Sequence, residues 1–411
     1  MNNISQILSE IKLEEERNLN FLHLTANENQ MSNTARSFLG SKICERYFFG
    51  AGENDIVDFG HLTALGFKGV ANLVTTAENA AKEMLHASSV NLNVLSGVHA
   101  MMSAILSTTN PGDAVMTVPL EYGGHFATKK IVEVMGRKHT YAEYDLENLK
   151  FDTKKIAKKF KEENIKALYL DVSYYLNPHN LKEIREAIGD QAIIIYDASH
   201  TIGLMMGQQF QSPLDEGADV ICANTHKTLP GPHKGMIAFK DEELAKNANA
   251  IINKCLYSTP HITHLIALAI TILEMKEFGI EYAKQIIKNS NAIAEAFVKL
   301  GYEVRKANTG RYSENHQVHI FIDDKGEKLP MYQNLINNNI STNFENTELT
   351  TNLKMYIRLG TAEITHRGMK EQEMIIIADL IDRAIKGQDV KQKVLELNSN
   401  FTKIMYSFDK N

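Results

Sequence analysis

The chain has 411 residues, of which 44% are hydrophobic and 23% are charged, a balance typical of a globular protein with a large core. A formal net charge of -6 argues against nucleic acid as a partner, and three widely separated cysteines exclude a disulfide framework. Acidic residues near the N-terminus argue against a signal peptide, and the longest apolar run, residues 265–273, is too short to span a membrane, so we expect a cytoplasmic protein with no membrane partner.

Four segments follow one another along the chain. Residues 1–55 predict a helix and then an extended arm, because apolar residues recur at helical spacing only near the start. Residues 56–275 alternate apolar runs with amphipathic stretches, which predicts an α/β domain with a mostly parallel sheet covered on both faces. Residues 276–388 predict a smaller α+β domain, and residues 389–411 predict a polar, peripheral tail.

The strand signals are short runs rich in β-branched residues. Strands are expected at residues 90–96, 113–118, 167–173, 192–199, 219–225, 235–239, 316–322 and 355–360. Amphipathic stretches predict helices at residues 151–164, 181–189 and 370–385, and a long helical region is expected near residues 262–300.

Polar residues stand directly after two of these runs, where a parallel sheet collects its ligands. Asp197 ends one run, with His200 close behind, and the next run leads into Thr225, His226 and Lys227. A lysine and a carboxylate at neighbouring strand ends suit pyridoxal 5'-phosphate, because the amine forms a Schiff base and the carboxylate keeps the pyridine nitrogen protonated. Either motif alone is explained equally well by a buried ion pair and a solvated turn lysine.

Two glycine-containing turns lie upstream. Ser96 and Gly97 separate an expected strand from an apolar helix, and backbone N–H groups at the start of that helix could hold a phosphate. Gly123 and Gly124 precede His125 and would let its ring approach a flat ligand closely. Each turn also has a plain structural explanation, since many strand-to-helix turns contain glycine and a histidine at a loop edge is common.

Taken in order, these pieces resemble serine hydroxymethyltransferase, a fold-type-I pyridoxal phosphate enzyme. The similar motifs are LTANEN, SGVHA, GGH, DASHTIGL, THKTLPGP and IRLGTAEITHRG, and the match runs from about residue 22 to 385. The resemblance implies an α/β large domain with a mostly parallel seven-stranded sheet and a smaller α+β C-terminal domain. It also implies at least a homodimer whose active sites are shared between chains.

The resemblance implies roles for the matching residues. The implied catalytic residues are Lys227, which forms the Schiff base, Asp197, which partners the pyridine nitrogen, His125, which stacks on the ring, and Glu45, which handles protons near the substrate hydroxyl. Further cofactor contacts are implied for Ser96, Gly97, Val98, His200, Thr225 and His226, and substrate contacts for Asn27, Tyr47, Ser173 and Arg358. Arg358 is implied to clamp the substrate α-carboxylate, with a surface salt bridge as the alternative.

The sequence departs from the family at the substrate end. Residues 42–52 are shortened and poor in phenols, and the family's Gly-rich phosphate loop is replaced by residues 255–264. Two histidines there, His261 and His264, have metal-like spacing without a third ligand, so no metal is expected. Glu345 stands where the family has a folate-contacting asparagine, and a carboxylate there would disfavour an anionic folate.

These features favour a small-molecule enzyme acting on a β-hydroxy-α-amino acid. The resemblance implies cleavage or formation of the Cα–Cβ bond, as in an aldolase or transaldolase, with an aldehyde or one-carbon acceptor and with tetrahydrofolate doubtful. The alternatives are an ordinary folate-dependent glycine hydroxymethyltransferase, another fold-type-I reaction such as transamination or decarboxylation, and a non-catalytic protein that keeps the cofactor pocket as a scaffold.

Overall fold

The computed structural model describes residues 3–145, 148, 150–190, 192–322, 326–345 and 355–409. Its centre is a seven-stranded sheet in the order β4 (Ser89–Asn91), β12 (Gly235–Phe239), β11 (Val220–Asn224), β10 (Ile193–Asp197), β9 (Ile165–Leu170), β5 (Ala114–Thr117) and β6 (Lys138–Tyr141). Only β12 runs antiparallel to its neighbours, so the expected mostly parallel sheet is confirmed. β6, with the sequence KHTY, lacks an apolar run and was not among the expected strands.

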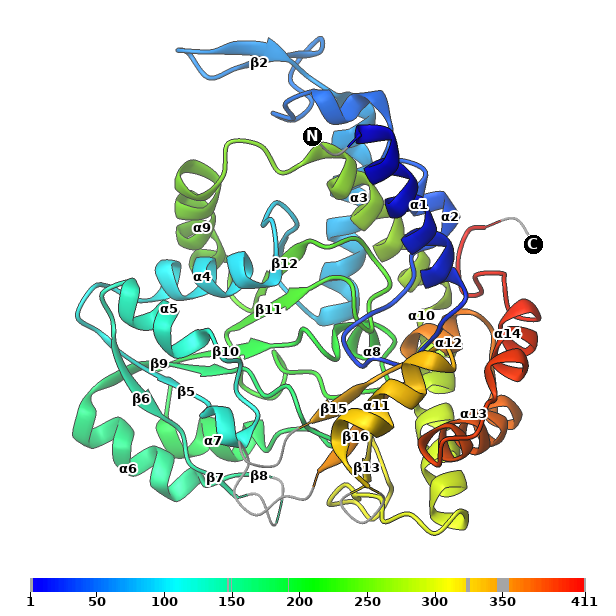
Figure 1. Ribbon diagram of the computed structural model, residues 1–411. Coiled ribbons are helices and arrows are strands. Elements are labelled where there is room, and N and C mark those ends of the chain that lie inside the picture. Colours follow the sequence, from blue (N-terminus) through cyan, green and yellow to red (C-terminus); the bar gives the residue numbers. More distant parts are fainter. Residues whose placement is uncertain are drawn as a thin grey trace.

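Helices cover both faces of this sheet (Figure 1). One face packs against α3 (Lys68–Leu85), α6 (Thr153–Glu163), α7 (Leu181–Ile188), α8 (Ile202–Met206) and α10 (Ile262–Lys299), and the other against α4 (Gly97–Thr108), α5 (Thr128–Val134) and α9 (Glu242–Ile251). The alternation of side chains along a strand sorts the core into these two layers, since Ile194 and Tyr196 join one cluster and Ile195 joins the other.

A smaller α+β unit is built around a second core. Its sheet has the order β13 (Gln317–Phe321), β16 (Tyr356–Gly360) and β15 (Asn343–Glu345), and its helices are α11 (Lys328–Asn337), α12 (Ala362–His366), α13 (Glu371–Ile385) and α14 (Lys391–Ser399). The long helix α10 packs mainly in the first core and contributes its last turns, from Ile293 to Phe297, to this second core. It therefore ties the two units together.

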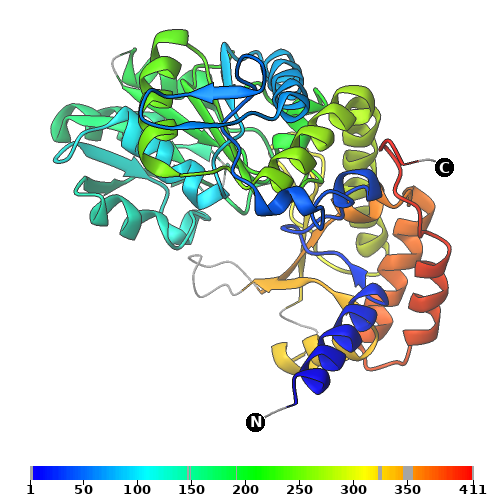
Figure 2. The ribbon, with the colours of Figure 1, turned by 90° about the horizontal axis from the view of Figure 1, so that it is seen from above.

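The N-terminal segment contacts the smaller unit first and then packs on the start of α10. After α1 (Ile4–Leu19), strand β1 (Leu22–His23) pairs in parallel with β14 (Ile340–Ser341). The arm continues through α2 (Asn33–Arg36) and a short 3-10 helix at Lys42–Glu45 to the hairpin of β2 (Ile56–Asp58) and β3 (Thr63–Leu65). Figure 1 shows this hairpin projecting from the body, and Figure 2 shows α1 extending outward to the N-terminus.

The residues after 388 differ from the polar, peripheral tail that was expected. Val394 and Leu397 of α14 are buried in the second core, because apolar residues recur at helical spacing within an otherwise polar stretch. Asp409 then accepts hydrogen bonds from the backbone N–H groups of Asn33 and Thr34, both at 2.8 Å, at the start of α2. In the described part of the chain no helix combines the length and apolar character needed to cross a membrane.

The remaining regular elements are short. They are β7 (Tyr144–Asp145), which pairs with β8 (Lys150–Phe151), a 3-10 turn at Leu120–Tyr122 and a π-helical turn at Ile252–Leu256. The first of these turns lies between β5 and the loop that carries His125, so it helps to position that loop.

Candidate active site

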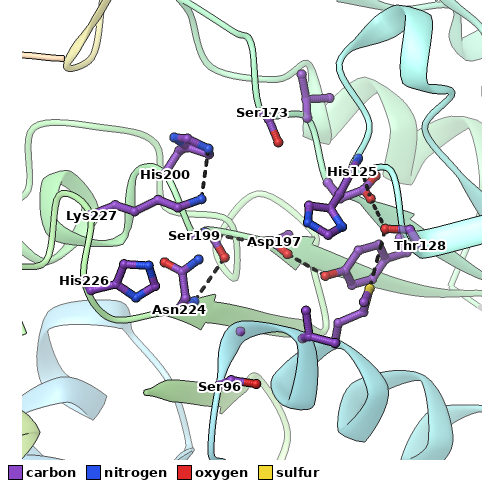
Figure 3. A pocket seen from close by; sticks show the side chains of 16 residues that line it. Ser96, His125, Thr128, Ser173, Asp197, Ser199, His200, Asn224, His226 and Lys227 are labelled. Atoms are coloured by element: carbon purple, nitrogen blue, oxygen red, sulfur yellow. Dashed lines mark hydrogen bonds between the residues drawn. The ribbon is translucent and has the colours of Figure 1, made fainter. Parts of the chain in front are cut away.

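A cavity of about 220 Å³ opens at the carboxyl ends of the central strands. Figure 3 shows its side chains converging from the end of β10, the turn after β11, the start of α4 and the loop before α5. The sequence-predicted residues that line it are Ser96, Gly97, Val98, His125, Ser173, Asp197, His200, His226 and Lys227. Residues more than a hundred positions apart in the sequence are thus brought to one place.

Lys227 lies in a turn whose shape is fixed by hydrogen bonds. The Thr225 hydroxyl, buried beneath the turn, donates to the Pro232 carbonyl at 2.6 Å. Asn29, in the N-terminal arm, donates from its amide nitrogen to the Lys227 carbonyl. Thr225 therefore shapes the turn without lining the cavity, and the arm helps to hold the lysine in position.

The Lys227 amine is buried and points at the His200 ring, with 3.0 Å between Nζ and Nε2. The pKa of Lys227 is lowered to about 8, mainly by burial; the Asp197 carboxylate opposes this shift and the positive charge of Arg358 adds to it. A lysine with this pKa has a much larger neutral, nucleophilic fraction near neutral pH than an exposed lysine has.

Gln317 on β13 determines the tautomer of the His200 ring. This residue was not identified from the sequence. Its Nε2 lies 3.0 Å from the Ser173 carbonyl, which can only accept, so Nε2 is the donating end of the amide. The same Nε2 lies 3.4 Å from His200 Nδ1, which is then the unprotonated ring nitrogen. Burial lowers the pKa of His200 well below its ordinary value, so the neutral ring carries its proton on Nε2 and can donate it to Lys227 only when that amine is neutral.

Asp197 is held rigidly at the end of β10. Its Oδ2 accepts a hydrogen bond from the Tyr169 hydroxyl at 2.5 Å, and its Oδ1 accepts one from the Ser199 backbone N–H at 2.8 Å. Burial raises the pKa of Tyr169 well above its ordinary value, so the phenol remains a donor. The carboxylate keeps lone pairs free for a further donor, such as a protonated ring nitrogen.

The His125 loop is fixed from below by Asp171. Asp171 Oδ2 accepts hydrogen bonds from the Thr128 hydroxyl at 2.5 Å and from the His125 backbone N–H at 3.2 Å, and burial raises the pKa of Asp171 to about 7. Gly124 is required in this loop, because a Cβ there would lie 2.1 Å from the Val118 carbonyl oxygen. Burial also lowers the pKa of His125, which favours the neutral ring.

The start of α4 has the features of an anion site. The Ser96 side chain caps the helix, Val98 is partly exposed to the cavity, and a Cβ at Gly97 would lie 2.7 Å from the Cβ of Asn224. His226 Nδ1 and Asn224 Oδ1 are buried and have no hydrogen-bond partner among the described residues. A protonated His226 Nδ1 beside the N–H groups of a helix N-terminus fits a phosphate group, whereas the Asn224 oxygen can only accept and would need a donor.

Arg358 lies at the edge of the cavity, on β16, and it is buried. Its Nε is 2.9 Å from Glu345 Oε1, its Nη1 is 3.5 Å from the Ser173 carbonyl, and its guanidinium carbon is 4.7 Å from the centre of the Tyr174 ring. The alternative of a solvated surface pair does not describe this environment. Asn27, from the arm, has a buried Oδ1 without a hydrogen-bond partner in the described structure.

Glu45 and Tyr47 are not brought into the cavity. The Glu45 side chain is 63% exposed and faces only Arg46, at 3.7 Å. Tyr47 is 57% exposed and stacks on Phe49, with 5.7 Å between ring centres. The segment that carries both residues lies away from the pocket of its own chain.

Further residues of the site were within reach of sequence reasoning. Asp171 follows the run ALYL, so the rule that singled out Asp197 applies to it equally. Tyr169 lies two residues earlier and therefore points to the same face as Asp171. In the described ranges no three histidine, cysteine or acidic side chains are arranged to hold a metal ion.

Comparisons with known proteins agree on one family. The family model described as serine hydroxymethyltransferase matches residues 2–381. Proteins named serine hydroxymethyltransferase from Methanosphaera stadtmanae and Methanocella arvoryzae are 33% and 34% identical, with 95% and 94% of this chain and 92% of each relative covered. The crystal structure of an L-threonine transaldolase from Pseudomonas fluorescens matches with a TM-score of 0.88 and 29% identity, over 99% of this chain and 94% of that chain.

Proposed function

The chain belongs to the serine hydroxymethyltransferase family of pyridoxal phosphate-dependent transferases, and we propose that it cleaves or forms the Cα–Cβ bond of a β-hydroxy-α-amino acid as an aldolase or transaldolase, without folate as the acceptor. The proposal rests on one contrast: the sequence motifs around the cavity match the family, whereas the segment with Glu45 and Tyr47 is shortened relative to it. The likeness to a solved transaldolase supports the same class of reaction.

The cavity offers partners for both the phosphate and the ring of pyridoxal phosphate. His226 Nδ1 and the backbone N–H groups at the start of α4 would hold the phosphate, and Asp197 would hold the proton of the ring nitrogen. Lys227 would hold the aldehyde carbon covalently, while His125 covers one face of the ring. Bound there, pyridoxal phosphate supplies an electron sink for the bonds of the amino acid Cα.

The amino acid would be held at the Arg358 side of the cavity. Its α-carboxylate binds the guanidinium, and removal of the β-hydroxyl proton breaks the Cα–Cβ bond, so that an aldehyde leaves and its bonding electrons stay with Cα. A proton then yields glycine, or a second aldehyde yields a new β-hydroxy amino acid. The substrate class is therefore a neutral β-hydroxy amino acid and an aldehyde.

Folate independence rests on the shortened segment and on the absent Gly-rich loop. Glu345 supports folate independence less than its charge suggested. Its carboxylate is paired with Arg358, so it is not an unpaired negative charge facing the cavity. The other candidate is the ordinary folate-dependent hydroxymethyltransferase, and the names of the curated relatives favour it.

Exchange of the glycine α-proton separates the two candidates. We expect the protein to exchange this proton with deuterium oxide, as followed by proton NMR, because the step needs only the cofactor, a bound carboxylate and a base. Tetrahydrofolate should neither bind tightly nor change the rate. Acceleration by tetrahydrofolate, or serine-to-glycine turnover that depends on it, would establish the ordinary hydroxymethyltransferase instead.

We also infer that the protein works as at least a homodimer. Helix α1 has no buried residue, yet Ile4, Leu8 and Ile11 form an apolar stripe on it and are 64%, 52% and 55% exposed. The cavity of one chain lacks Glu45, which a neighbouring chain could contribute. A second copy would cover the stripe and complete the site.

Light scattering tests the assembly. The wild type should have at least twice the mass of one chain, and Leu8→Glu combined with Ile11→Glu should dissociate it and remove activity, because both changes place charges on the apolar stripe. Ser9→Glu, on the opposite side of α1, should leave the assembly intact. A fully active monomer refutes the shared site.

A further inference from the structure

The guanidinium of Arg358 is occupied by a carboxylate of its own chain. In the antiparallel pair of β15 and β16, Glu345 lies opposite Tyr356, and Arg358 is two residues further along the same face of the sheet. Diagonal neighbours of this kind are within reach of long side chains, and Glu345 Oε1 is 2.9 Å from Arg358 Nε. The sheet register therefore builds the ion pair.

The pair is sheltered from solvent. The Arg358 and Glu345 side chains are 8% and 20% exposed, and the Tyr174 ring covers the guanidinium. Burial and then the charge of Glu345 raise the pKa of the Tyr174 hydroxyl, which keeps its proton. With little water to screen it, the carboxylate acts strongly on any other charge near the arginine.

The contacts divide the guanidinium into two parts. The Glu345 carboxylate lies beside the Nε edge without a directed hydrogen bond from Nε, and the Ser173 carbonyl accepts from Nη1 at 3.5 Å, so the guanidinium keeps N–H groups for a ligand. A substrate carboxylate bound there shares one positive charge with Glu345. The two carboxylates then repel each other across the guanidinium.

We propose that Glu345 is a specificity-determining residue, whose carboxylate pairs electrostatically with Arg358 and weakens its hold on the amino acid α-carboxylate. The site consequently favours amino acids whose side chain adds no negative charge, and it releases glycine and the product readily. This inference rests on the proposed function, because it requires that Arg358 binds the α-carboxylate.

Glycine titration of the holoenzyme, followed by the absorbance of the cofactor, tests the proposal. Glu345→Gln keeps the shape of the side chain but removes its charge, so the glycine Kd should fall by about tenfold. The KM should fall with it, while kcat does not rise. An unchanged or higher Kd overturns the proposal.

Two controls complete the experiment. Glu281→Gln removes the same charge at an exposed pair with Lys284 on α10 and should leave glycine binding unchanged. Arg358→Lys should weaken glycine binding, because lysine lacks the planar fork. If Arg358→Lys binds glycine like the wild type, the proposed role of Arg358 fails together with this inference. If it binds weakly but Glu345→Gln does not bind more tightly, the inference alone is overturned.

Discussion

Replacement of Lys227 by alanine should reduce turnover by on the order of 10³-fold or more, because the amine is the proposed covalent anchor of the cofactor and a basic group that lines the cavity. The structure supports this role through the burial of the amine, its hydrogen bond to His200 and its lowered pKa. Lys227→Arg is the matched control: it keeps a positive charge but cannot anchor the cofactor, so it should bind pyridoxal phosphate reversibly and remain inactive.

Chemical trapping identifies the lysine directly. Borohydride reduces the C=N bond between cofactor and amine, and peptide mapping should then find the label on Lys227. Lys234 is the internal comparison, because it is also buried and its pKa is lowered by burial to about 7, yet its amine donates to the Val94 carbonyl at 2.9 Å. A label on Lys234, or an active Lys227→Ala protein, contradicts the assignment.

The pH dependence of cofactor capture follows from the same environment. The neutral amine is the form that reacts, so capture of pyridoxal phosphate by the apoprotein should quicken as pH rises and level off above about 8. An exposed lysine with the ordinary pKa of 10.5 would level off more than two units higher. Stopped-flow absorbance across this range measures the difference.

The sequence was sufficient to predict those features of the fold and site that depend on local residue patterns. Alternating apolar runs and amphipathic stretches predict the central sheet, and the strand-end rule points to Asp197 and Lys227. The long helix expected near residues 262–300 corresponds to α10, because a single apolar periodicity continues through it. These features depend on neighbours in the chain.

Pairings between distant segments could not be predicted in this way. The contact of Gln317 with His200 joins β13 of the smaller sheet to the turn after β10, and the Glu345–Arg358 pair depends on the register of β15 against β16. Glu345 was interpreted from its charge alone, as a group that repels folate, because nothing in the sequence reveals which cation faces it. Register is set by tertiary packing, so a single sequence leaves such pairs open.

The implied substrate contacts of Glu45 and Tyr47 are missing from the single chain for a different reason. The family resemblance implies that both residues contact the substrate, yet each is more than half exposed in a single chain. If a neighbouring chain supplies the rest of the site, such positions are completed only in the assembly. Neither the sequence nor one folded chain contains that information.

An exchange of aldehydes should produce the second large effect. When L-threonine and a different aldehyde are supplied together, the protein should form acetaldehyde and a new β-hydroxy amino acid, because the electron pair left on Cα can attack the second carbonyl. Folate takes no part in these bond changes, so omitting it should not change the rate at which the new amino acid forms. The matched control is Arg358→Lys, which should reduce formation of both products through weaker amino acid binding.

Mass spectrometry of this reaction tests the central claim most directly. The reaction is run with isotopically labelled L-threonine and a panel of aldehydes, with tetrahydrofolate either present or absent. The account predicts that the labelled glycine unit appears in a new β-hydroxy amino acid, at the same rate with and without folate. Labelled glycine units that never join a second aldehyde, together with serine formation that requires a folate one-carbon donor, would contradict it.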